Sequence, residues 1–293
     1  MQKIKKLKLL LAVSGGPDSM FMLNKYRKHN IIVAHVNYNK REDSWKDENI
    51  VSEFCKKNNI PFFNLSIQKY EDKINNFQSY AREIRYNFFK KIYTENHCDF
   101  LYIAHNKDDF FENVILQKQQ NKIVNYWGIK KETTLYNMKV FRPFIFKLWK
   151  KQIEKLNFKN GVNFAIDYTN NLSIYERNKV RLKYKNNKIQ KAFIFYFYRF
   201  KNLFFIFKNK KTSNFLYKWE KKDFNINYLK HKNEKFILNV IYNLINQKFL
   251  DINLSKQKLL SIKTFLFSKN RTSSFKLKDD VFLIKKQNKL IFN

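Results

Sequence analysis

The chain has 293 residues, of which 44% are hydrophobic, and it carries a formal net charge of +35 at pH 7. This length and apolar content exclude wholesale disorder and allow one large domain or two ordinary ones. The charge points to a polyanionic partner, with nucleic acid first and an anionic membrane surface second. The joint abundance of Lys, Asn, Ile and Phe is also what an AT-rich coding sequence produces, which weakens the argument from charge alone.

The two cysteines, Cys55 and Cys98, stand far apart and form no CxxC pair. Their number and spacing exclude a disulfide framework and a four-cysteine zinc site within this chain. They fit a reducing cytoplasm, where free thiols persist.

Two apolar stretches resemble a signal peptide or a membrane span, but we interpret both as parts of a folded domain. Residues 1–16 are basic and then apolar, like a signal peptide, but the apolar run is short and leads into a glycine turn, so we expect a first strand there. Residues 193–207 are interrupted by two cations and an asparagine and fall short of the roughly 18–20 apolar residues that a span needs. We expect this second stretch to be a buried or RNA-facing helix of a soluble protein.

Short apolar runs alternate with helical patterns through the first half of the chain. The expected strands are residues 7–13, 31–36, 62–67 and 100–104, and the expected helices are 19–29, 44–58 and 77–96. A weaker strand at 140–146 and a helix at 148–156 continue the series. Alternation at this spacing predicts βαβ units and an α/β fold with a doubly wound parallel sheet.

The alternation fades after about residue 185, where Lys, Asn and aromatic residues dominate. We expect helices at 232–248 and 254–267, followed by three short strands with turns at 278–280 and 287–288. The sequence therefore predicts an α/β domain at 1–188 and a smaller, basic, mainly helical region at 189–293 that ends in short strands.

Two of only four glycines, Gly15 and Gly16, stand together in the sequence SGGPDS between the first expected strand and helix. Glycines allow positive φ and a close ligand, and the free N–H groups of the following helix form an oxyanion cradle suited to phosphate. Ser14 and Ser19 can add hydroxyl donors. Asp18 would repel a phosphate unless Mg²⁺ bridges it to a pyrophosphate. The alternative is an ordinary Asp-containing turn with a helix N-cap.

SGGPDS matches the SGGxDS signature of the PP-loop ATP pyrophosphatases. Five later stretches resemble one family of that superfamily, the tRNA(Ile)-lysidine synthetases, in a short, mycoplasma-like form. They are AHVNYNKREDS at 34–44, YAREIRYNFF at 80–89, IAHNKDDFFENVIL at 103–116, RPF at 142–144 and DYTNNLSIYERNKVR at 167–181. The departures from the family pattern are Tyr38, Asn106, Phe110, Asn113 and the stretch 117–131, which stands where the family has a glycine-rich loop.

The resemblance implies a reaction in two steps. ATP adenylates the C2 carbonyl oxygen of the wobble cytidine in the CAU anticodon of tRNA(Ile), and the ε-amine of free lysine then attacks C2 and expels AMP. The product, lysidine, changes codon reading from AUG to AUA. Residues 1–188 would then be the ATP-binding catalytic domain and 189–293 the tRNA-binding region of a cytoplasmic enzyme without a membrane partner. A homodimer is left open.

The resemblance also implies the residues of the site. Those expected to bind ATP are Ser14, Gly15, Gly16, Pro17, Asp18, Ser19, His105 and Arg177, with Asp18 also contacting Mg²⁺. Those expected to be catalytic are Asp18, Arg85, Asp109 and Glu112. On a helix, Asp108 and Asp109 can each share a face with Glu112, and such a carboxylate pair can hold an ammonium group. The resemblance favours Asp109 with Glu112 for substrate lysine, and makes Asp108 the helix start or a supporting group. An acidic first turn that complements the helix dipole is the alternative.

Arginines and one histidine complete the candidate site. Arg82 and Arg85 share a helix face, and a guanidinium suits a carboxylate or phosphate; we favour Arg85 for the lysine or the adenylate over a merely solvated basic face. His105 ends a strand at the edge where doubly wound sheets bind ligands, although a packed core histidine is the alternative. Arg177 and Arg181 could reach ATP phosphates or the tRNA backbone.

Lys and Arg crowd residues 147–235 and alternate with aromatic residues. We expect this region to bind tRNA through phosphate contacts and stacking on unpaired bases, although any single lysine could simply be a solvated surface residue. Three other classes stay open. A PP-loop tRNA thiolase needs a cysteine pair or an iron–sulfur cluster that Cys55 and Cys98 do not offer. The others are an inactive RNA-binding paralogue and a small-molecule amidotransferase.

Overall fold

The structure is a computed structural model that describes residues 7–39, 42–67, 77–120, 124–165, 176–249, 252, 254–278 and 280–292. The chain forms two compact units. The first contains Met1–Asn113 and Gly128–Lys191, and the second contains Val114–Trp127 and Ala192–Asn293. The second unit is thus built from two separate segments of the chain, and the sequence did not predict that Val114–Trp127 belongs to it.

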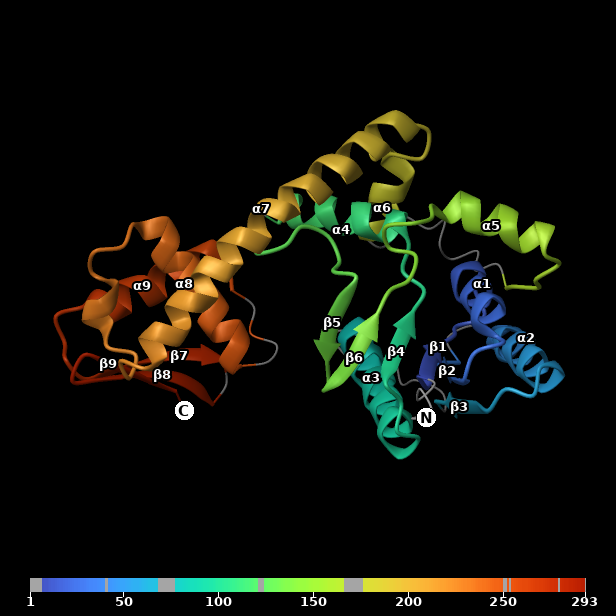
Figure 1. Cartoon of the computed structure of the whole chain (residues 1–293), viewed down its shortest axis with the longest axis horizontal. Coiled ribbons are helices and arrows are strands. Elements are labelled where there is room, and N and C mark those ends of the chain that lie inside the picture. The colour runs from blue at the N-terminus through green and yellow to red at the C-terminus, as the bar shows by residue number, and fades with distance from the viewer. Residues whose placement is uncertain are drawn as a thin grey trace, which may run out of the picture. The chain divides into compact units, whose positions relative to one another are not determined.

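A six-stranded sheet forms the centre of the first unit, in the order β3-β2-β1-β4-β6-β5 (Figure 1). Its strands are β1 (Leu9–Ala12), β2 (Ile31–Asn37), β3 (Phe62–Ser66), β4 (Phe100–Ile103), β5 (Glu132–Leu135) and β6 (Met138–Phe141). Neighbours pair in parallel, except that β5 is antiparallel to β6. The predicted parallel-dominated α/β sheet is confirmed. The strand expected at 140–146 is wrong in its bounds, because β6 begins at Met138 and ends at Phe141.

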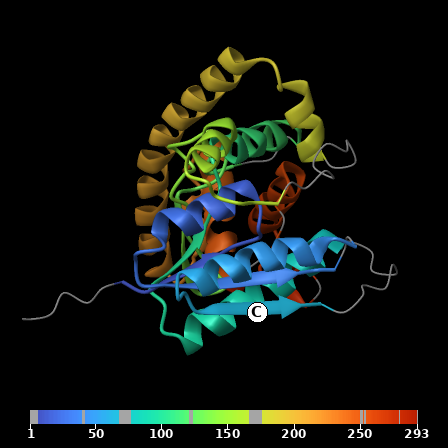
Figure 2. The same cartoon turned by 90° about the vertical axis from the view of Figure 1, so that its right-hand side faces the viewer.

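Helices cover both faces of this sheet. α1 (Pro17–Tyr26), α2 (Ser44–Lys57) and α5 (Lys150–Lys159) cover one face, and α3 (Phe77–Glu95) covers the other. The chain also forms α4 (Lys107–Gln119) and α6 (Glu176–Lys183). Leu9 and Leu11 of β1 pack in one core with α1, α2 and α5, whereas Leu10 packs with α3 in the other. Figure 2 shows α2 and α3 on opposite sides of the strands. Burial on both faces explains why these strands are almost continuously apolar in sequence.

The strand order determines where a ligand can bind. The chain runs from β1 to β2 and β3 on one side, and then returns to β4 on the other side of β1. The carboxyl ends of β1 and β4 therefore lie next to each other at a topological switch point, the usual ligand position in sheets of this kind. SGGPDS follows β1, and His105 and Asn106 follow β4.

The second unit is mainly helical and ends in a small antiparallel sheet of order β7-β8-β9. Its elements are α7 (Lys188–Glu220, which begins in the first unit), η2 (Ile226–Leu229), α8 (Glu234–Lys248), α9 (Lys256–Phe267), β7 (Ser273–Lys278), β8 (Val281–Lys286) and β9 (Lys289–Phe292). Trp219 of α7 is fully buried in a core shared with α8, α9 and the strands. The two predicted helices and three short strands are confirmed. Gln287 and Asn288 both have positive φ, as a two-residue hairpin turn requires.

The apolar run at 193–207 is helical, since it lies in α7. Of the two alternatives expected for this helix, burial is wrong for many of its side chains, because Phe193, Phe200 and Phe207 are 69%, 62% and 76% exposed. The RNA-facing alternative stays a prediction. Among the described residues, no helix has both the length and the apolar content needed to cross a bilayer.

Candidate active site

The SGGPDS turn joins β1 to α1 and needs its first glycine. Gly15 has φ of +84°, and a Cβ atom there would lie 2.9 Å from the backbone oxygen of Asp47 in α2. Both the conformation and the packing exclude a larger side chain at this position. Gly16 has φ of −72°, and its added Cβ would approach only Ser14 Oγ, at 3.8 Å. Pro17 is the first residue of α1, where its missing N–H costs nothing.

Hydrogen bonds hold this turn in shape. Ser19 Oγ donates to the Gly16 carbonyl at 2.9 Å and accepts the Ser14 N–H at 3.2 Å. The buried Asn157 of α5 donates from Nδ2 to the Pro17 carbonyl at 2.8 Å. Ala165 N–H donates to the Gly15 carbonyl at 2.9 Å. The turn is therefore formed in advance at the N-terminus of α1, where backbone N–H groups and the helix dipole favour an anion.

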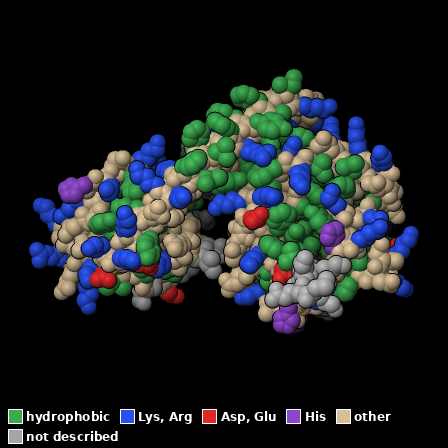
Figure 3. Space-filling view, viewed as in Figure 1, with side chains coloured by type: hydrophobic (Ala, Val, Ile, Leu, Met, Phe, Trp, Pro, Cys, Tyr) green, Lys and Arg blue, Asp and Glu red, His purple; other side chains and the backbone are tan. Residues whose placement is uncertain are grey.

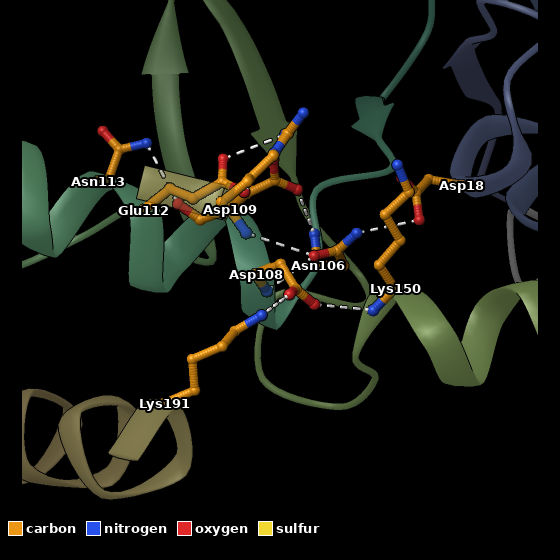
Figure 4. A network of polar contacts seen from close by, with 9 residues as sticks. Asp18, Asn106, Asp108, Asp109, Glu112, Asn113, Lys150 and Lys191 are labelled. Carbon is orange, nitrogen blue, oxygen red and sulfur yellow. Dashed lines mark hydrogen bonds and ion pairs between the residues drawn. The ribbon is translucent and has the colours of Figure 1, made fainter. Parts of the chain in front are cut away.

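Asp18 lies on the first turn of α1 and is linked to the end of β4. Asn106 Nδ2 donates to Asp18 Oδ1 at 2.9 Å (Figure 4). Burial, followed by the nearby Asp109 carboxylate, raises the pKa of Asp18 to about 7. A buried carboxylate next to a second carboxylate is stabilised by a cation.

Mg²⁺ that arrives with a nucleotide fits this arrangement better than a resident metal does. Within the described ranges, no three His, Cys, Asp or Glu side chains gather as a metal cage. In nucleotide sites, Mg²⁺ uses one or two carboxylates and takes its remaining ligands from phosphates and water. Asp18, beside the anion cradle, offers such a carboxylate.

Asn106, a departure from the family pattern, caps α4. Its Oδ1 accepts the backbone N–H groups of Asp108 and Asp109 at 2.8 and 3.3 Å, and its own N–H donates to Asp109 Oδ2 at 2.8 Å. This reciprocal arrangement is a capping box with Asn and Asp in its two positions. The same amide therefore starts α4 and positions Asp18. Sequence reasoning did not assign this role, although Asn before an acidic first turn is an N-cap signal.

Glu112 and Asp109 lie together, and Arg181 of α6 binds the first of them. Arg181 donates from Nε to Glu112 Oε1 at 2.5 Å and from Nη2 to Oε2 at 3.1 Å. Arg181 Nη2 is 3.9 Å from Asp109 Oδ1. Burial raises the pKa of Glu112, although the hydrogen bonds from Arg181 oppose this shift. The structure thus brings the two predicted carboxylates together and adds an arginine whose partner the sequence did not reveal.

Asp108 forms contacts separate from those two carboxylates. It accepts the backbone N–H of Lys150 at 2.8 Å and forms an ion pair with Lys191 (Figure 4). Asp108 therefore links the start of α4 to α5 and to the first turn of α7, in keeping with a supporting position.

The other departures from the family pattern have structural partners. Phe110 is fully buried, and a Cβ atom on Gly128, which has φ of +73°, would lie 2.6 Å from its ring. Tyr38 donates its hydroxyl to the Ala81 carbonyl at 2.9 Å. Asn113 donates from Nδ2 to the backbone carbonyl one turn earlier in α4, at 3.2 Å. These residues pack and hold the frame around the site.

His105 follows β4, and Arg142 Nε donates to its Nδ1 at 3.0 Å. Burial is the main cause that lowers the pKa of His105 to about 4, so the imidazole is neutral at pH 7. Arg85 and Arg177 are close enough for their charges to contribute to this lowering. Arg82 is exposed on α3. Sequence reasoning did not single out Arg142, which is buried in the RPF segment.

Neither cysteine is suited to thiolate chemistry. Cys55 and Cys98 are both buried, and burial raises their pKa values to about 12 and about 11. A thiol is reactive when its pKa is lowered, so this environment argues against a thiolase. Residues 167–175 of the last family-like stretch lie outside the described part of the chain.

Residues 1–187 match the PP-loop domain family. With the glycine turn at the switch point of a parallel sheet, this match defines the chain as a PP-loop protein. It is 40% identical to the tRNA(Ile)-lysidine synthase of Mesomycoplasma hyopneumoniae over 99% of this chain and 97% of that protein. It is 41% identical to the tRNA(Ile)-lysidine synthase of Mycoplasmopsis pulmonis over 94% of this chain and 96% of that protein. The chain therefore belongs to the tRNA(Ile)-lysidine synthase family.

A solved structure with a similar fold is the U34-tRNA thiolase NcsA from Methanococcus maripaludis with its [4Fe-4S] cluster. The TM-score is 0.53 at 20% sequence identity, and the match covers 67% of this chain and 72% of that one. This similarity concerns the fold alone.

Proposed function

We propose that the chain carries out the reaction of its family in the cytoplasm: it joins free L-lysine to C2 of the wobble cytidine in the CAU anticodon of tRNA(Ile). ATP is split into AMP and pyrophosphate. Residues 1–188 bind ATP and catalyse the reaction, and residues 189–293 bind the tRNA. A homodimer is the assembled form. The observation that carries the proposal is the preformed Ser14–Ser19 turn, linked through Asn106 to the acidic start of α4.

In the first step, the cytidine O2 bonds to the α-phosphorus of ATP and the bond to pyrophosphate breaks. The N–H groups at the start of α1 bind the pyrophosphate oxygens, which carry charge as they leave. Mg²⁺ held by Asp18 would neutralise part of that charge. Asn106 orients the Asp18 carboxylate, and His105 and Arg177 contact the nucleotide.

In the second step, the lysine Nε atom loses a proton and attacks C2, and the C2–O bond breaks with release of AMP. Asp109 and Glu112 bind the amine end of the lysine before it reacts. Because Arg181 already holds Glu112 through two hydrogen bonds, Asp109 is the main contact and Glu112 fixes the orientation of Arg181. Arg85 binds the carboxylate of the lysine or the phosphate of the adenylate.

The test is a ligation assay with labelled lysine, ATP, Mg²⁺ and a tRNA(Ile) transcript that carries CAU. We expect label in the tRNA with the unaltered chain. In the Asp18→Asn variant we expect the rate to fall by at least about 100-fold, because the charge on the leaving group is no longer balanced. The matched control is Asp223→Asn, since Asp223 is exposed and pairs with Lys289 outside the first unit. Absence of label with the unaltered chain, or a normal rate in Asp18→Asn, would contradict the proposal.

A further inference from the structure

The ends of two neighbouring strands bring Arg142 against His105. Arg142 directly follows β6, and His105 follows β4 two residues after its last position. The two strands are parallel, with Tyr102 opposite Phe141, so their carboxyl ends lie at the same edge of the sheet, where ligands bind. Both residues belong to the first unit, so their contact is a property of that unit alone.

Backbone carbonyls hold Arg142 in position. Its side chain is buried, and its Nη1 donates to the Lys130 carbonyl at 2.9 Å. Its backbone N–H donates to the Lys131 carbonyl, also at 2.9 Å. Its Nε lies 3.0 Å from His105 Nδ1. Because the segment before β5 anchors the guanidinium independently of the histidine, the Nε–H keeps its direction toward the ring.

The direction of this hydrogen bond determines the tautomer of His105. A guanidinium has five N–H donors and no acceptor, and it stays protonated in proteins. Nδ1 of His105 must therefore accept, and the neutral imidazole carries its proton on Nε2. Protonation of Nδ1 would bring two donors together, so the contact also disfavours the imidazolium.

His35 on β2 has the opposite kind of partner. Its Nδ1 lies 2.8 Å from the Val13 carbonyl oxygen, which can only accept, so Nδ1 of His35 carries a proton. Burial lowers the pKa of His35, which favours the neutral ring. The structure therefore predicts opposite tautomers for two histidines of one sheet, and His35 can serve as an internal reference for His105.

The charges around His105 suit an anion at its Nε2–H. Burial is the main cause that lowers its pKa, Asp109 opposes this lowering, and the charges of Arg177 and Arg85 add to it. His105 is only half-buried, so a ligand can reach it. Figure 3 shows Lys and Arg side chains spread over the displayed face, with few Asp or Glu between them. A neutral donor among cations is complementary to a phosphate oxygen.

We propose that Arg142 is a positioning residue that holds His105 as the neutral Nε2–H tautomer. His105 then donates a hydrogen bond to a phosphate oxygen of the nucleotide and cannot accept the proton that the lysine amine loses. It acts in the first step of the reaction and not in the second. The tautomer does not depend on the ligase reaction, whereas the two roles of His105 rest on the proposed function.

The first test is ¹⁵N NMR of the full chain labelled at histidine, without substrates. At pH 7 we expect a protonated Nε2 and a bare Nδ1 in His105, and the reverse pattern in His35. The signals are assigned by their loss in His105→Gln and in His35→Gln. A protonated Nδ1 in His105 would overturn the proposal.

The second test removes the donor. Arg142→Met keeps an apolar stem but has no N–H to donate, so we expect His105 to show both tautomers. Arg271→Met is the matched control, because Arg271 is exposed in the second unit, and it should leave the His105 signals unchanged. If His105 keeps only the Nε2–H form in a folded Arg142→Met variant, another group sets the tautomer and the proposal fails. Circular dichroism verifies folding, and if this variant does not fold, the unaltered chain still decides the tautomer.

The third test separates a hydrogen-bond donor from a proton acceptor. By covalent position, the amide of Gln replaces Nε2 of histidine and the amide of Asn replaces Nδ1, so only His105→Gln keeps a donor toward the nucleotide. We expect pyrophosphate release to slow roughly 10-fold in His105→Asn and less than about 3-fold in His105→Gln. If both variants release pyrophosphate at the normal rate and lose only the lysine step, His105 is the proton acceptor and the proposal is wrong.

The same measurements distinguish this inference from the proposed function. Absence of ligation by the unaltered chain, together with the expected tautomers, contradicts the proposed function and leaves the role of Arg142 intact. Normal ligation together with a protonated Nδ1 in His105 contradicts only the inference drawn from Arg142.

Discussion

At the scale of single residues, His105 links stability to pH. Its pKa in the folded chain is about 4, below the ordinary 6.5, mainly because of burial. Between these two pH values the unfolded chain binds a proton that the folded chain does not bind. The free energy of unfolding should therefore fall as the pH is lowered from about 6.5 to about 4.

The variant His105→Asn keeps an acceptor for Arg142 but removes the titrating group. We expect urea unfolding to show a flatter pH profile for this variant in that window. His231→Asn is the control, because His231 is exposed in the second unit. Parallel profiles for His105→Asn and the unaltered chain would contradict the assignment.

Asn106 has two roles that one substitution can separate. Serine is also a good N-cap, so Asn106→Ser should keep the free energy of unfolding within about 0.5 kcal/mol. It removes the amide that donates to Asp18, and we expect pyrophosphate release to slow by roughly 10-fold. Asn96→Ser, just after the end of α3, should leave the rate unchanged, because the Asn96 amide donates to the Ile92 carbonyl of its own helix. Equal rates in the two variants would show that the Asp18 contact has no role.

At the scale of elements, alanine substitutions at the two adjacent glycines of the turn should have different effects on stability. Gly15→Ala must adopt a strained positive φ and displace Asp47 of α2, so it should lower the free energy of unfolding by roughly 2 kcal/mol or more. Gly16 has an ordinary φ and space for a methyl group, so Gly16→Ala should change the free energy of unfolding by less than about 1 kcal/mol. Chemical denaturation without nucleotide measures both. Equal losses would mean that the turn is not built as described.

The sequence predicted the helices and strands whose side chains pack into a hydrophobic core. Strands β1, β2 and β4 are mainly apolar runs, because helices cover both faces of the sheet. Strand β5 was missed, since ETTL is short, polar and at the edge. The apolar run in α7 predicted a helix, but a pattern of apolar residues does not say whether the same chain or another covers them.

The candidate site was predictable only where its residues lie close together in the sequence. Helical spacing placed Asp109 and Glu112 on one face, and the structure brings them together. Spacing could not give the contact from Asn106 to Asp18, which are 88 positions apart, or from Arg181 to Glu112, which are 69 apart. Such contacts depend on which strand ends meet at the switch point, and this is a property of the folded sheet.

At the scale of the whole molecule, the net charge of +35 sets how the chain meets tRNA. If about six phosphates are neutralised, the logarithm of the binding constant should fall with the logarithm of salt concentration with a slope near −5. Filter binding of the CAU transcript over a range of salt measures this slope. A slope shallower than about −2 would mean that phosphate contacts do not supply the affinity.

The central claim is that the Ser14–Ser19 turn holds the phosphates of ATP beside Asp18. A crystal structure of the chain with a non-hydrolysable ATP analogue and Mg²⁺ tests it most directly. We expect the β- and γ-phosphates at the N-terminus of α1 and the metal between them and Asp18. Density for the nucleotide at any other place, or an empty turn at saturating analogue, would contradict the account.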